Sequence, residues 1–358
     1  MTILLSNDDA QTLLTMSDCV SVLQQTYAAA HAGTAINGRR SDMVGPTSRA
    51  DRSYVLKMMG AVQPDLKVGA VRINSDLFSW VSEGAQRRRV KVPAAPGDRW
   101  VGLVLLFSTE TGEPLAIFPD GVVQRMRVGA TSGIAVQLLA RPEADVLAIL
   151  GTGWQAEAQV MAAAAVRPLR EIRCFSPNAE RRAAFAARMQ ALLDIATIAC
   201  ESAVDAVRGA DIVLCATNSS SHVLDATMLT PGMHIGTIRD REIAPAAIAR
   251  ADLVVVHDRD NLTGQHVEIA HGAVFEEKRK ELGQDARTSA LVSAPSLAEL
   301  VGGSVVGRQR PEDITCFLNY HGIGLQFAAL GALLHAKAKE QGRGHHLPTE
   351  WFTEDVHS

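Results

Sequence analysis

The sequence predicts an α/β protein in which a doubly wound Rossmann domain is joined to a separate α+β domain. Three observations predict this fold class. Apolar strand-like runs alternate with alanine-rich helical stretches between residues 128 and 317, which is typical of a parallel sheet covered by helices on both faces. A glycine-rich turn follows the first of these runs, as in dinucleotide-binding folds. The length of 358 residues suits two domains, at about 150 residues per domain.

The composition is that of a folded protein with a sizeable core. Apolar residues make up 47% of the chain, charged residues 21%, and the formal net charge is −4, so nothing indicates disorder or a basic nucleic-acid surface. The longest nearly uncharged apolar stretch, 322–334, is shorter than the ~18 to 20 residues of a membrane span. The N-terminal segment lacks the basic flank and the small-residue cleavage site of a signal peptide. We expect a cytoplasmic protein that binds neither nucleic acid nor membrane.

The cysteines and histidines show no pattern of metal ligands. The five cysteines are far apart, and no CxxC pair exists, so buried free thiols are expected rather than a zinc site or disulfides. His266 and His271 are five residues apart, and His345 and His346 are adjacent; neither spacing places two ligands on one face beside a carboxylate. No metal site is expected.

Residues 1–127, together with 318–358, are expected to form the α+β domain. The segment 6–9 (SNDD) predicts a helix start in which the third helical residue is acidic. From Tyr54 the pattern turns strand-like, in the runs SYVLKMMGAV, KVGAVRI, WVGLVLLFS and PLAIFPD, with a hairpin turn at 111–114. The stretch 322–341 has a helical apolar pattern and is expected to pack back on this domain.

A basic segment, QRRRVKVP at 86–93, lies between two of these strand-like runs. It could dock a phosphate or an acidic group. A solvated loop is the favoured interpretation, because charge runs are usually exposed.

The remaining residues, 128–317, are expected to form the Rossmann domain. Six strands are predicted, in the runs ADVLAILG, EIRCFS, IATIAC, ADIVLCAT, GMHIGTI and ADLVVVH. The helices predicted between them are 155–166, 179–193, 202–208 and 244–249. This alternation gives β-α-β-α-β followed by a second half.

The strongest single motif is the turn GTGWQA after the first of these strands. Gly151 permits the tight turn, Gly153 lets a pyrophosphate approach the backbone, and Ala156 takes the position of close helix–strand packing. Thr152, Trp154 and Gln155 complete the turn, whose helix amides would face the diphosphate. An ordinary glycine-rich connection is the alternative, but the flanking strand and helix and the five further strands favour a dinucleotide.

The end of the second strand decides between NADP and NAD. An acidic side chain there would bind the ribose 2′-hydroxyl and repel a 2′-phosphate, but the chain has Ser176 and Asn178 at this place, with Arg181 one helical turn later. NADP(H) is therefore favoured, and NAD(H) remains possible. Arg181 is otherwise a solvated residue of the first helical turn. The loop after the fourth strand adds Thr217 and Asn218 to the expected cofactor site.

The sequence resembles the ornithine cyclodeaminase/mu-crystallin family of NAD(P)-dependent imine-forming and imine-reducing enzymes. The resemblance covers about residues 39–348 and depends on four stretches: YVLK, GLVLLFSTETGEPLAIFPDGVVQRMRVGATSG, GTGWQAEAQ and PEDITCFLNYHGIGLQ. It implies a homodimer whose first domain, completed by the C-terminal helix, forms the interface and holds the substrate against the nicotinamide.

The resemblance also implies catalytic residues. The family's early carboxylate-binding arginine matches Arg40, with Arg39 as the alternative, and its active-site lysine matches Lys57. The arginine of its RTAA motif matches Arg127, and Asp120 matches an acidic position before that motif. Arginines hold a carboxylate at two points, and a lysine beside a C=N bond can supply a proton. Lys57 could instead be a solvent-reaching lysine at the edge of a strand. Arg127 could instead form a salt bridge that closes the domain junction.

Arg72, in the run AVRI, is a further inward-facing candidate that the resemblance does not support.

One departure from the family concerns the cyclodeaminase reaction. Those enzymes carry a catalytic aspartate in a glycine-rich loop after a PGxHIN turn, whereas this chain reads PGMHIGTIRDRE and is shorter there. Asp240 lies near the expected place but does not align, and Val128 replaces the threonine of RTAA.

We therefore expect an oxidoreductase that reduces a small α-imino acid or, in reverse, acts as an amino-acid dehydrogenase. An ornithine cyclodeaminase-type lyase with recycled NAD and a non-catalytic mu-crystallin-like binding protein are the alternatives.

Overall fold

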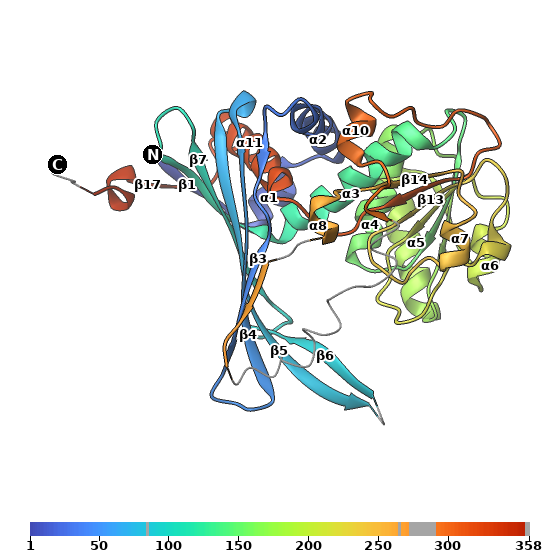
Figure 1. The fold of residues 1–358 in the computed structure, drawn as a ribbon, viewed down its shortest axis with the longest axis horizontal. Coiled ribbons are helices and arrows are strands. Elements are labelled where there is room, and N and C mark those ends of the chain that lie inside the picture. Colours follow the sequence, from blue (N-terminus) through green and yellow to red (C-terminus); the bar gives the residue numbers. More distant parts are fainter. Residues whose placement is uncertain (84–85, 264–265, 272–290, 355–358) are drawn as a thin grey trace.

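The computed structural model describes residues 1–83, 86–263, 266–271 and 291–354, which form two sheets with their helices (Figure 1). One sheet has ten strands and is largely antiparallel, and the other has seven strands that are all parallel. The predicted fold class, a doubly wound domain with a second α+β domain, is confirmed.

The ten-stranded sheet runs in the order β15-β3-β4-β5-β7-β8-β1-β17, with β2 paired to β4 and β6 paired to β5. Its central strands alternate between buried and exposed residues, so one face is covered and the other faces outward. The strands are β1 (Thr2–Leu4), β2 (Ile36–Asn37), β3 (Ser41–Pro46), β4 (Arg52–Gln63), β5 (Val68–Glu83), β6 (Gln86–Val92), β7 (Val101–Ser108), β8 (Pro114–Pro119), β15 (His266–Ile269) and β17 (His345–Leu347).

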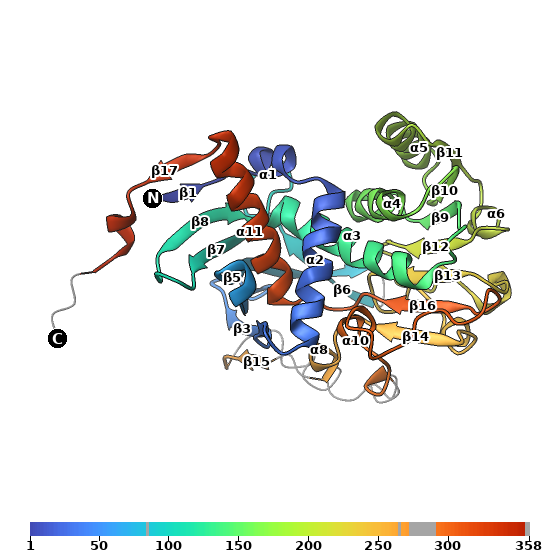
Figure 2. The ribbon, with the colours of Figure 1, turned by 90° about the horizontal axis from the view of Figure 1, so that it is seen from above.

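Three helices cover the inner face of this sheet at one end: α1 (Asn7–Leu13), α2 (Met16–His31) and α11 (Gly324–Gln341) (Figure 2). The predicted helix start is confirmed, because Ser6 and Asp9 form a reciprocal capping box. Helix α11 approaches β4 closely, where a Cβ on Gly324 would lie 2.4 Å from the carbonyl oxygen of Gly60. The C-terminal helix therefore packs on the ten-stranded sheet. The 3₁₀ helices η1 (Pro64–Leu66) and η4 (Thr349–Phe352) also lie in this part of the chain.

The seven-stranded sheet has the order β11-β10-β9-β12-β13-β16-β14. From β9 the chain adds β10 and β11 on one side, and it then returns to add β12 on the other side of β9. The gap between β9 and β12 is therefore the topological switch point, where α/β folds bind nucleotides. The strands are β9 (Val146–Leu150), β10 (Glu171–Phe175), β11 (Ala196–Ala199), β12 (Ile212–Cys215), β13 (His234–Thr237), β14 (Leu253–Val256) and β16 (Thr315–Leu318). The helices are α4 (Trp154–Val166), α5 (Ala179–Leu193), α6 (Ala203–Val207), η2 (Ala226–Met228), α7 (Pro245–Ile248), α8 (Asp260–Thr263) and α10 (Leu297–Val301).

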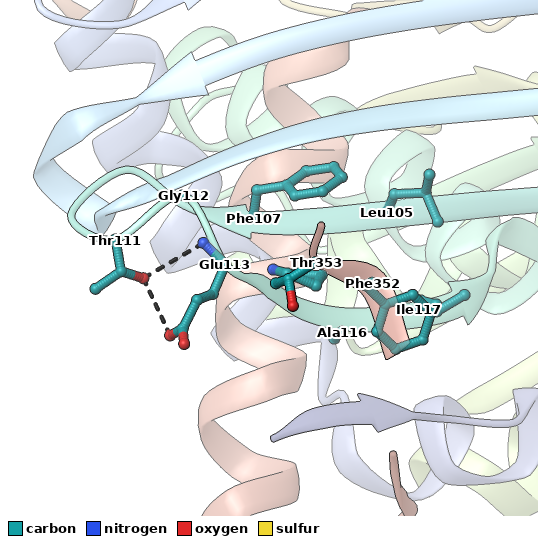
Figure 3. Close-up of a pocket in the computed structure, with 10 residues that line it drawn as sticks. Leu105, Phe107, Thr111, Gly112, Glu113, Ala116, Ile117, Phe352 and Thr353 are labelled. Atoms are coloured by element: carbon teal, nitrogen blue, oxygen red, sulfur yellow. Dashed lines mark hydrogen bonds between the residues drawn. The ribbon is translucent and has the colours of Figure 1, made fainter. Parts of the chain in front are cut away.

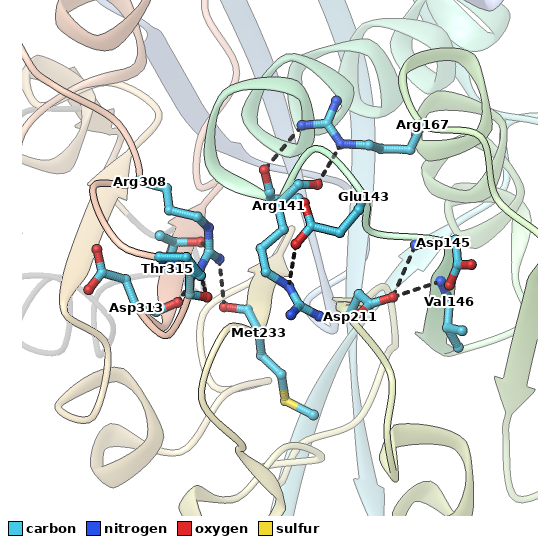
Figure 4. Close-up of polar contacts among 12 residues, drawn as sticks. Arg141, Glu143, Asp145, Val146, Arg167, Asp211, Met233, Arg308, Asp313 and Thr315 are labelled. Carbon is cyan, nitrogen blue, oxygen red and sulfur yellow. Dashed lines mark hydrogen bonds and ion pairs between the residues drawn. The ribbon is translucent and has the colours of Figure 1, made fainter.

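One long helix, α3 (Asp120–Leu139), joins the two sheets. It packs on α4 through glycines, since a Cβ on Gly129 would lie 2.5 Å from the Ala158 carbonyl oxygen. Arginine side chains bind the free carbonyls at its C-terminal end (Figure 4). Arg167 donates to the carbonyls of Gln137 and Ala140, and Arg308 donates to that of Leu139. These bonds satisfy the carbonyls that a helix end leaves without partners.

The structure corrects one prediction and adds strands that the sequence analysis did not assign. The basic segment 86–93 is not a loop over its first seven residues, because 86–92 form strand β6, which pairs with β5 through Leu77↔Val92. Strand β16 lies within the family stretch PEDITCFLNYHGIGLQ, and β15 lies in sequence within 128–317 but pairs with β3 of the other sheet. The division into a domain of residues 1–127 with 318–358 and a domain of residues 128–317 stays a proposal. Helix α3 spans the boundary at residue 127, and β15 belongs by sequence to the second range but by pairing to the sheet of the first.

The interior is apolar around both sheets, and all five cysteines are buried and unpaired, as the sequence predicts. In the part of the chain that the structure describes, no helix is long and apolar enough to cross a bilayer.

Candidate active site

A row of polar side chains crosses the inner face of the ten-stranded sheet, next to the N-terminal end of α11. The strand register places Asp42, Lys57, Asn74 and Gly102 side by side on β3, β4, β5 and β7. Their neighbours one row nearer the helices are Met59, Arg72 and Val104. Directly opposed residues on one face lie about 5 Å apart, so the alternation of the strands brings these groups together.

The glycine in this row makes room for Asp120, the first residue of α3. A Cβ on Gly102 would lie 2.1 Å from Asp120 Oδ1 and 2.4 Å from Asn74 Nδ2. Asp120 accepts from Arg72 Nε at 2.8 Å and from Asn74 Nδ2 at 3.0 Å. The predicted residue Asp120 therefore lies in the site as the partner of Arg72, the candidate that the resemblance did not support.

Lys57, the predicted proton donor, is paired with a carboxylate that the sequence analysis did not single out. Its ammonium lies 2.7 Å from Asp76 Oδ2 and 4.8 Å from the centre of the Phe78 ring. Asp76 is almost fully buried and also lies 2.6 Å from Lys91 Nζ. Burial lowers the pKa of Lys57, although the bond to Asp76 opposes this effect. The pKa of Asp76 is also lowered, because the two lysines outweigh the effect of burial.

Arg127 is a buried cation whose bonding partners are neutral. Its guanidinium donates to Gln326 Oε1 at 3.0 Å and to Gln124 Oε1 at 3.2 Å, and it lies 5.6 Å from the Phe327 ring. Burial, with repulsion from Arg72, lowers the pKa of Arg127 to about 9. Among the described residues no carboxylate forms an ion pair with it, so the predicted alternative of a salt bridge at the domain junction finds no partner there.

Arg40 is half-buried and holds Asp42 at two points, with both N–H···O distances at 2.7 Å. Its charge is among the causes that lower the pKa values of Lys57 and Arg127, so it lies near both. Arg39, the alternative, is exposed. The structure thus brings Arg40, Lys57, Asp120 and Arg127 into one region.

A buried hydrogen-bond network binds the Arg127 guanidinium through Gln326. Gln326 accepts from Arg127 and donates to Thr131 Oγ1 at 2.6 Å and to the Tyr27 hydroxyl at 3.0 Å. The Tyr27 hydroxyl is 2.6 Å from His257 Nε2, and burial lowers the pKa of His257 to about 4. The neutral histidine therefore belongs to a fixed network, which the sequence analysis did not predict.

The nucleotide turn lies at the switch point of the parallel sheet. Gly151 has a φ of +111°, and a Cβ there would lie 2.2 Å from the Ala216 carbonyl oxygen, so only glycine fits. At Gly153 a Cβ would meet nothing within 4 Å, which leaves open space above the backbone. No side chain caps the N-terminus of α4, and Ala156 packs against the sheet fully buried. These features fit a dinucleotide diphosphate on the amides of α4.

The residues that would surround the adenosine ribose lie at the end of β10. Thr152 donates to the Ser176 hydroxyl at 2.9 Å, and Asn178 is committed to capping α5 through Arg181 N. Arg181 is exposed, and Arg182 donates to the Ser176 carbonyl oxygen at 3.2 Å. Two guanidinium groups therefore flank the start of α5.

Across the switch point, a buried carboxylate fixes the loop that carries Thr217 and Asn218. Glu242 accepts from the backbone N–H of Thr217 and from the Thr237 hydroxyl. Asn218 is exposed. Asp240 is exposed too, and its charge is among the influences on the pKa values of Tyr320 and His321.

The sequence analysis missed Asp76, Lys91, Gln326 and the space at Gly102. The sequence does contain a signal for Asp76. Arg72, Asn74 and Asp76 are every second residue of β5, so they share one face of the strand, and all three are buried polar residues. In the described ranges, no three His, Cys, Asp or Glu side chains are grouped so that they could hold a metal ion.

Comparison with known proteins gives a family and a fold. The model of the ornithine cyclodeaminase/mu-crystallin family matches residues 4–341. A Δ¹-pyrroline-2-carboxylate reductase of Bacillus cereus is 30% identical over 284 residues, which cover 75% of this chain and 82% of that enzyme. The structure of the Thermococcus litoralis Δ¹-pyrroline-2-carboxylate reductase with NADH and L-proline has a TM-score of 0.77 at 24% identity, covering 97% of this chain and all of that one. The iminosuccinate reductase of Paracoccus denitrificans with NAD⁺ has a TM-score of 0.73 at 20% identity, covering 95% of this chain and 97% of that one.

Proposed function

The chain belongs to the ornithine cyclodeaminase/mu-crystallin family, and on this premise we propose that it is an NAD(P)H-dependent reductase of a small α-imino acid. The observation that carries the proposal is the buried Arg127, which has neutral hydrogen-bond partners and, like Lys57, lies near Arg40. A buried guanidinium without an anion is costly. A substrate carboxylate would relieve that cost through a two-point contact.

The residues around Arg127 fit the rest of such a substrate. Arg40 adds a second positive charge beside the carboxylate, although it already holds Asp42. Lys57 carries the proton that the imine nitrogen needs, and burial makes this ammonium a stronger acid than a free lysine. Asp120 and Arg72 neutralise one another and keep the floor of the site rigid.

The bound reduced nicotinamide would supply a hydride to the imine carbon. Gly151, Gly153 and the free amides of α4 would hold the diphosphate, with Thr152, Trp154 and Gln155 around it. The absence of a carboxylate at Ser176 and the flanking Arg181 and Arg182 favour NADP(H) over NAD(H). Thr217 and Asn218 lie in the loop on the other side of the switch point.

We further propose that the protein is a homodimer that associates through the outer face of the ten-stranded sheet. This face carries exposed apolar side chains at Tyr54, Val62, Val101 and Leu103, which a second copy would cover. A cavity of about 310 Å³ opens on the same face, and Leu105, Ile117 and Phe352 are among the residues that line it (Figure 3). Sedimentation velocity of the purified protein tests the proposal, and a monomer at micromolar concentration would contradict it.

A substrate panel tests the reductase proposal. Cyclic imino acids, and α-keto acids mixed with ammonia or amines, are supplied with NADPH or NADH, and the absorbance at 340 nm is followed. A reductase consumes cofactor in proportion to product. Incubation with L-ornithine and catalytic NAD⁺ separates the lyase alternative, which forms proline and ammonia without net change at 340 nm. A binding protein gives neither signal.

A further inference from the structure

Two lysines share one buried carboxylate in the candidate site. Asp76 is 2% exposed, and its two oxygens lie 2.7 Å from Lys57 Nζ and 2.6 Å from Lys91 Nζ. A carboxylate balances one ammonium, so this cluster holds one positive charge in excess. Like charges held this close disfavour the protonated form of each.

The second lysine reaches Asp76 from a different structural element. Lys91 lies on β6, the strand formed by residues 86–92 of the basic segment, and its ammonium is 5.7 Å from the centre of the Trp100 ring. Its side chain is one-third exposed, whereas that of Lys57 is 16% exposed. Lys57 is therefore the sheltered member of the pair, and Lys91 the one in contact with solvent.

We infer that Lys91 is a positioning residue for proton donation by Lys57, because it keeps Asp76 paired when Lys57 becomes neutral. The inference rests on the proposed reductase function. In that reaction the N–H bond of Lys57 breaks and the proton forms a new N–H bond on the imine nitrogen. The imine carbon gains the hydride, so that C=N becomes CH–NH while the reduced nicotinamide is oxidised.

The need for Lys91 follows from what this transfer leaves behind. With Lys57 neutral, Asp76 alone would be a buried carboxylate without a counter-ion, which is strongly unfavourable. Lys91 remains within contact distance and supplies that counter-ion. It also weakens the hold of Lys57 on its proton before the transfer, so the donor is the stronger acid.

The other charged groups that face Lys57 do not replace this function. Asp42 lies opposite Lys57 on β3, but Arg40 holds it at two points and the two charges cancel. Asn74, opposite on β5, is neutral. Burial and the charge of Arg40 lower the pKa of Lys57, while Asp76 and Asp42 raise it. Lys91 is the additional cation that contacts the same carboxylate.

The test compares Lys91→Met with Lys91→Arg. The first variant removes the charge but keeps an apolar stem beside Trp100, and the second keeps the charge. Lys339→Met serves as a control, because Lys339 is exposed at the end of α11. Two quantities are measured for each protein. One is the pH at which Lys57 becomes half-reactive toward acetic anhydride, followed by mass spectrometry, and the other is the alkaline limb of the kcat profile.

In Lys91→Met the midpoint for Lys57 should rise by about 1 to 3 pH units, the scale of a like charge at this range, and the alkaline limb should follow it. Lys91→Arg and Lys339→Met should match the wild type. If Lys91→Met still reduces imines but the midpoint for Lys57 is unchanged, the inference about Lys91 is overturned and the proposed reductase function stands. A shifted midpoint in a protein without imine reduction would overturn the proposed function and leave the shared charge in place.

Discussion

Replacing Arg127 by methionine should make the ligand-free protein more stable while impairing its activity. Burial lowers the pKa of Arg127 from 12.5 to about 9. At about 1.4 kcal/mol per pKa unit, the charge then costs on the order of 5 kcal/mol. Since both pKa values lie above neutral pH, the folded state binds this proton less well than the unfolded state. The cost is therefore fully present at pH 7 and decreases as the pH rises through 9.

The substitution also removes two hydrogen bonds, to Gln124 and Gln326, worth about 1 kcal/mol each. Gln326 Oε1 keeps its bond from Ile323 N, so it is not left without a partner. Methionine can pack on Phe327 in place of the guanidinium. We expect a net gain of about 1 to 3 kcal/mol in the free energy of unfolding.

Urea unfolding of the ligand-free protein at pH 7 measures this gain. The control is Arg125→Met, because Arg125 is as buried as Arg127 but has the anionic partner Glu157 at 3.4 Å. That variant should lose about 1.5 to 3 kcal/mol, because it removes the bonds of Arg125 to Glu157 and Gln11, although Glu157 keeps its pair with Arg188. Arg127→Met should in addition lower kcat/KM for an α-imino acid about 10²-fold, as expected for a lost charge-assisted contact. A loss of stability in Arg127→Met similar to that in Arg125→Met would refute the view that Arg127 awaits an anion.

Three further predictions concern the other parts of the site. Lys57→Met should lower kcat by about 10²-fold or more with unchanged nucleotide affinity, measured by fluorescence titration; an active variant would assign Lys57 to structure only. Ser176→Asp should weaken NADPH binding and spare NADH, because a carboxylate repels the 2′-phosphate; equal weakening of both would contradict the placement of Ser176. Gly102→Ala should displace Asp120 from Arg72 and lower the free energy of unfolding, measured by urea unfolding, by about 3 kcal/mol or more. A free energy within about 0.5 kcal/mol of the wild type would show that Asp120 can move aside.

The parts of the fold that the sequence predicts well depend on local chemistry. The capping box at Ser6 and Asp9 and the turn at Gly151 are set by residues a few positions apart. The predicted helix 179–193 coincides with α5, whose cap at Asn178 is equally local. Such features need no knowledge of the rest of the molecule.

The parts that the sequence analysis missed depend on distant pairing. Strand β6 is a strand because it pairs with an extension of β5, whereas its basic composition alone favours a loop. Strand β15 crosses to the other sheet to pair with β3. The same holds for the site, where Lys91 and Asp76 meet only because β5 and β6 form a ribbon. Resemblance supplied Lys57 and Arg127, but their partners follow only from the register of the strands.

The relation between the two halves of the site depends on helix α3. Its first residue, Asp120, is bound in the row of polar residues on the sheet, and Arg127 lies two turns further along. Two residues beyond Arg127, Gly129 packs directly on Ala158 of α4, the helix that begins at the nucleotide turn. A side chain at Gly129 would push α4 away, so close packing fixes Arg127, the proposed carboxylate-binding residue, relative to the amides of α4, proposed to bind the diphosphate. Hydride transfer requires the reacting atoms to be held about 3 to 3.5 Å apart. A single helix that carries the proposed substrate contact at Arg127 and packs on α4 would meet that requirement.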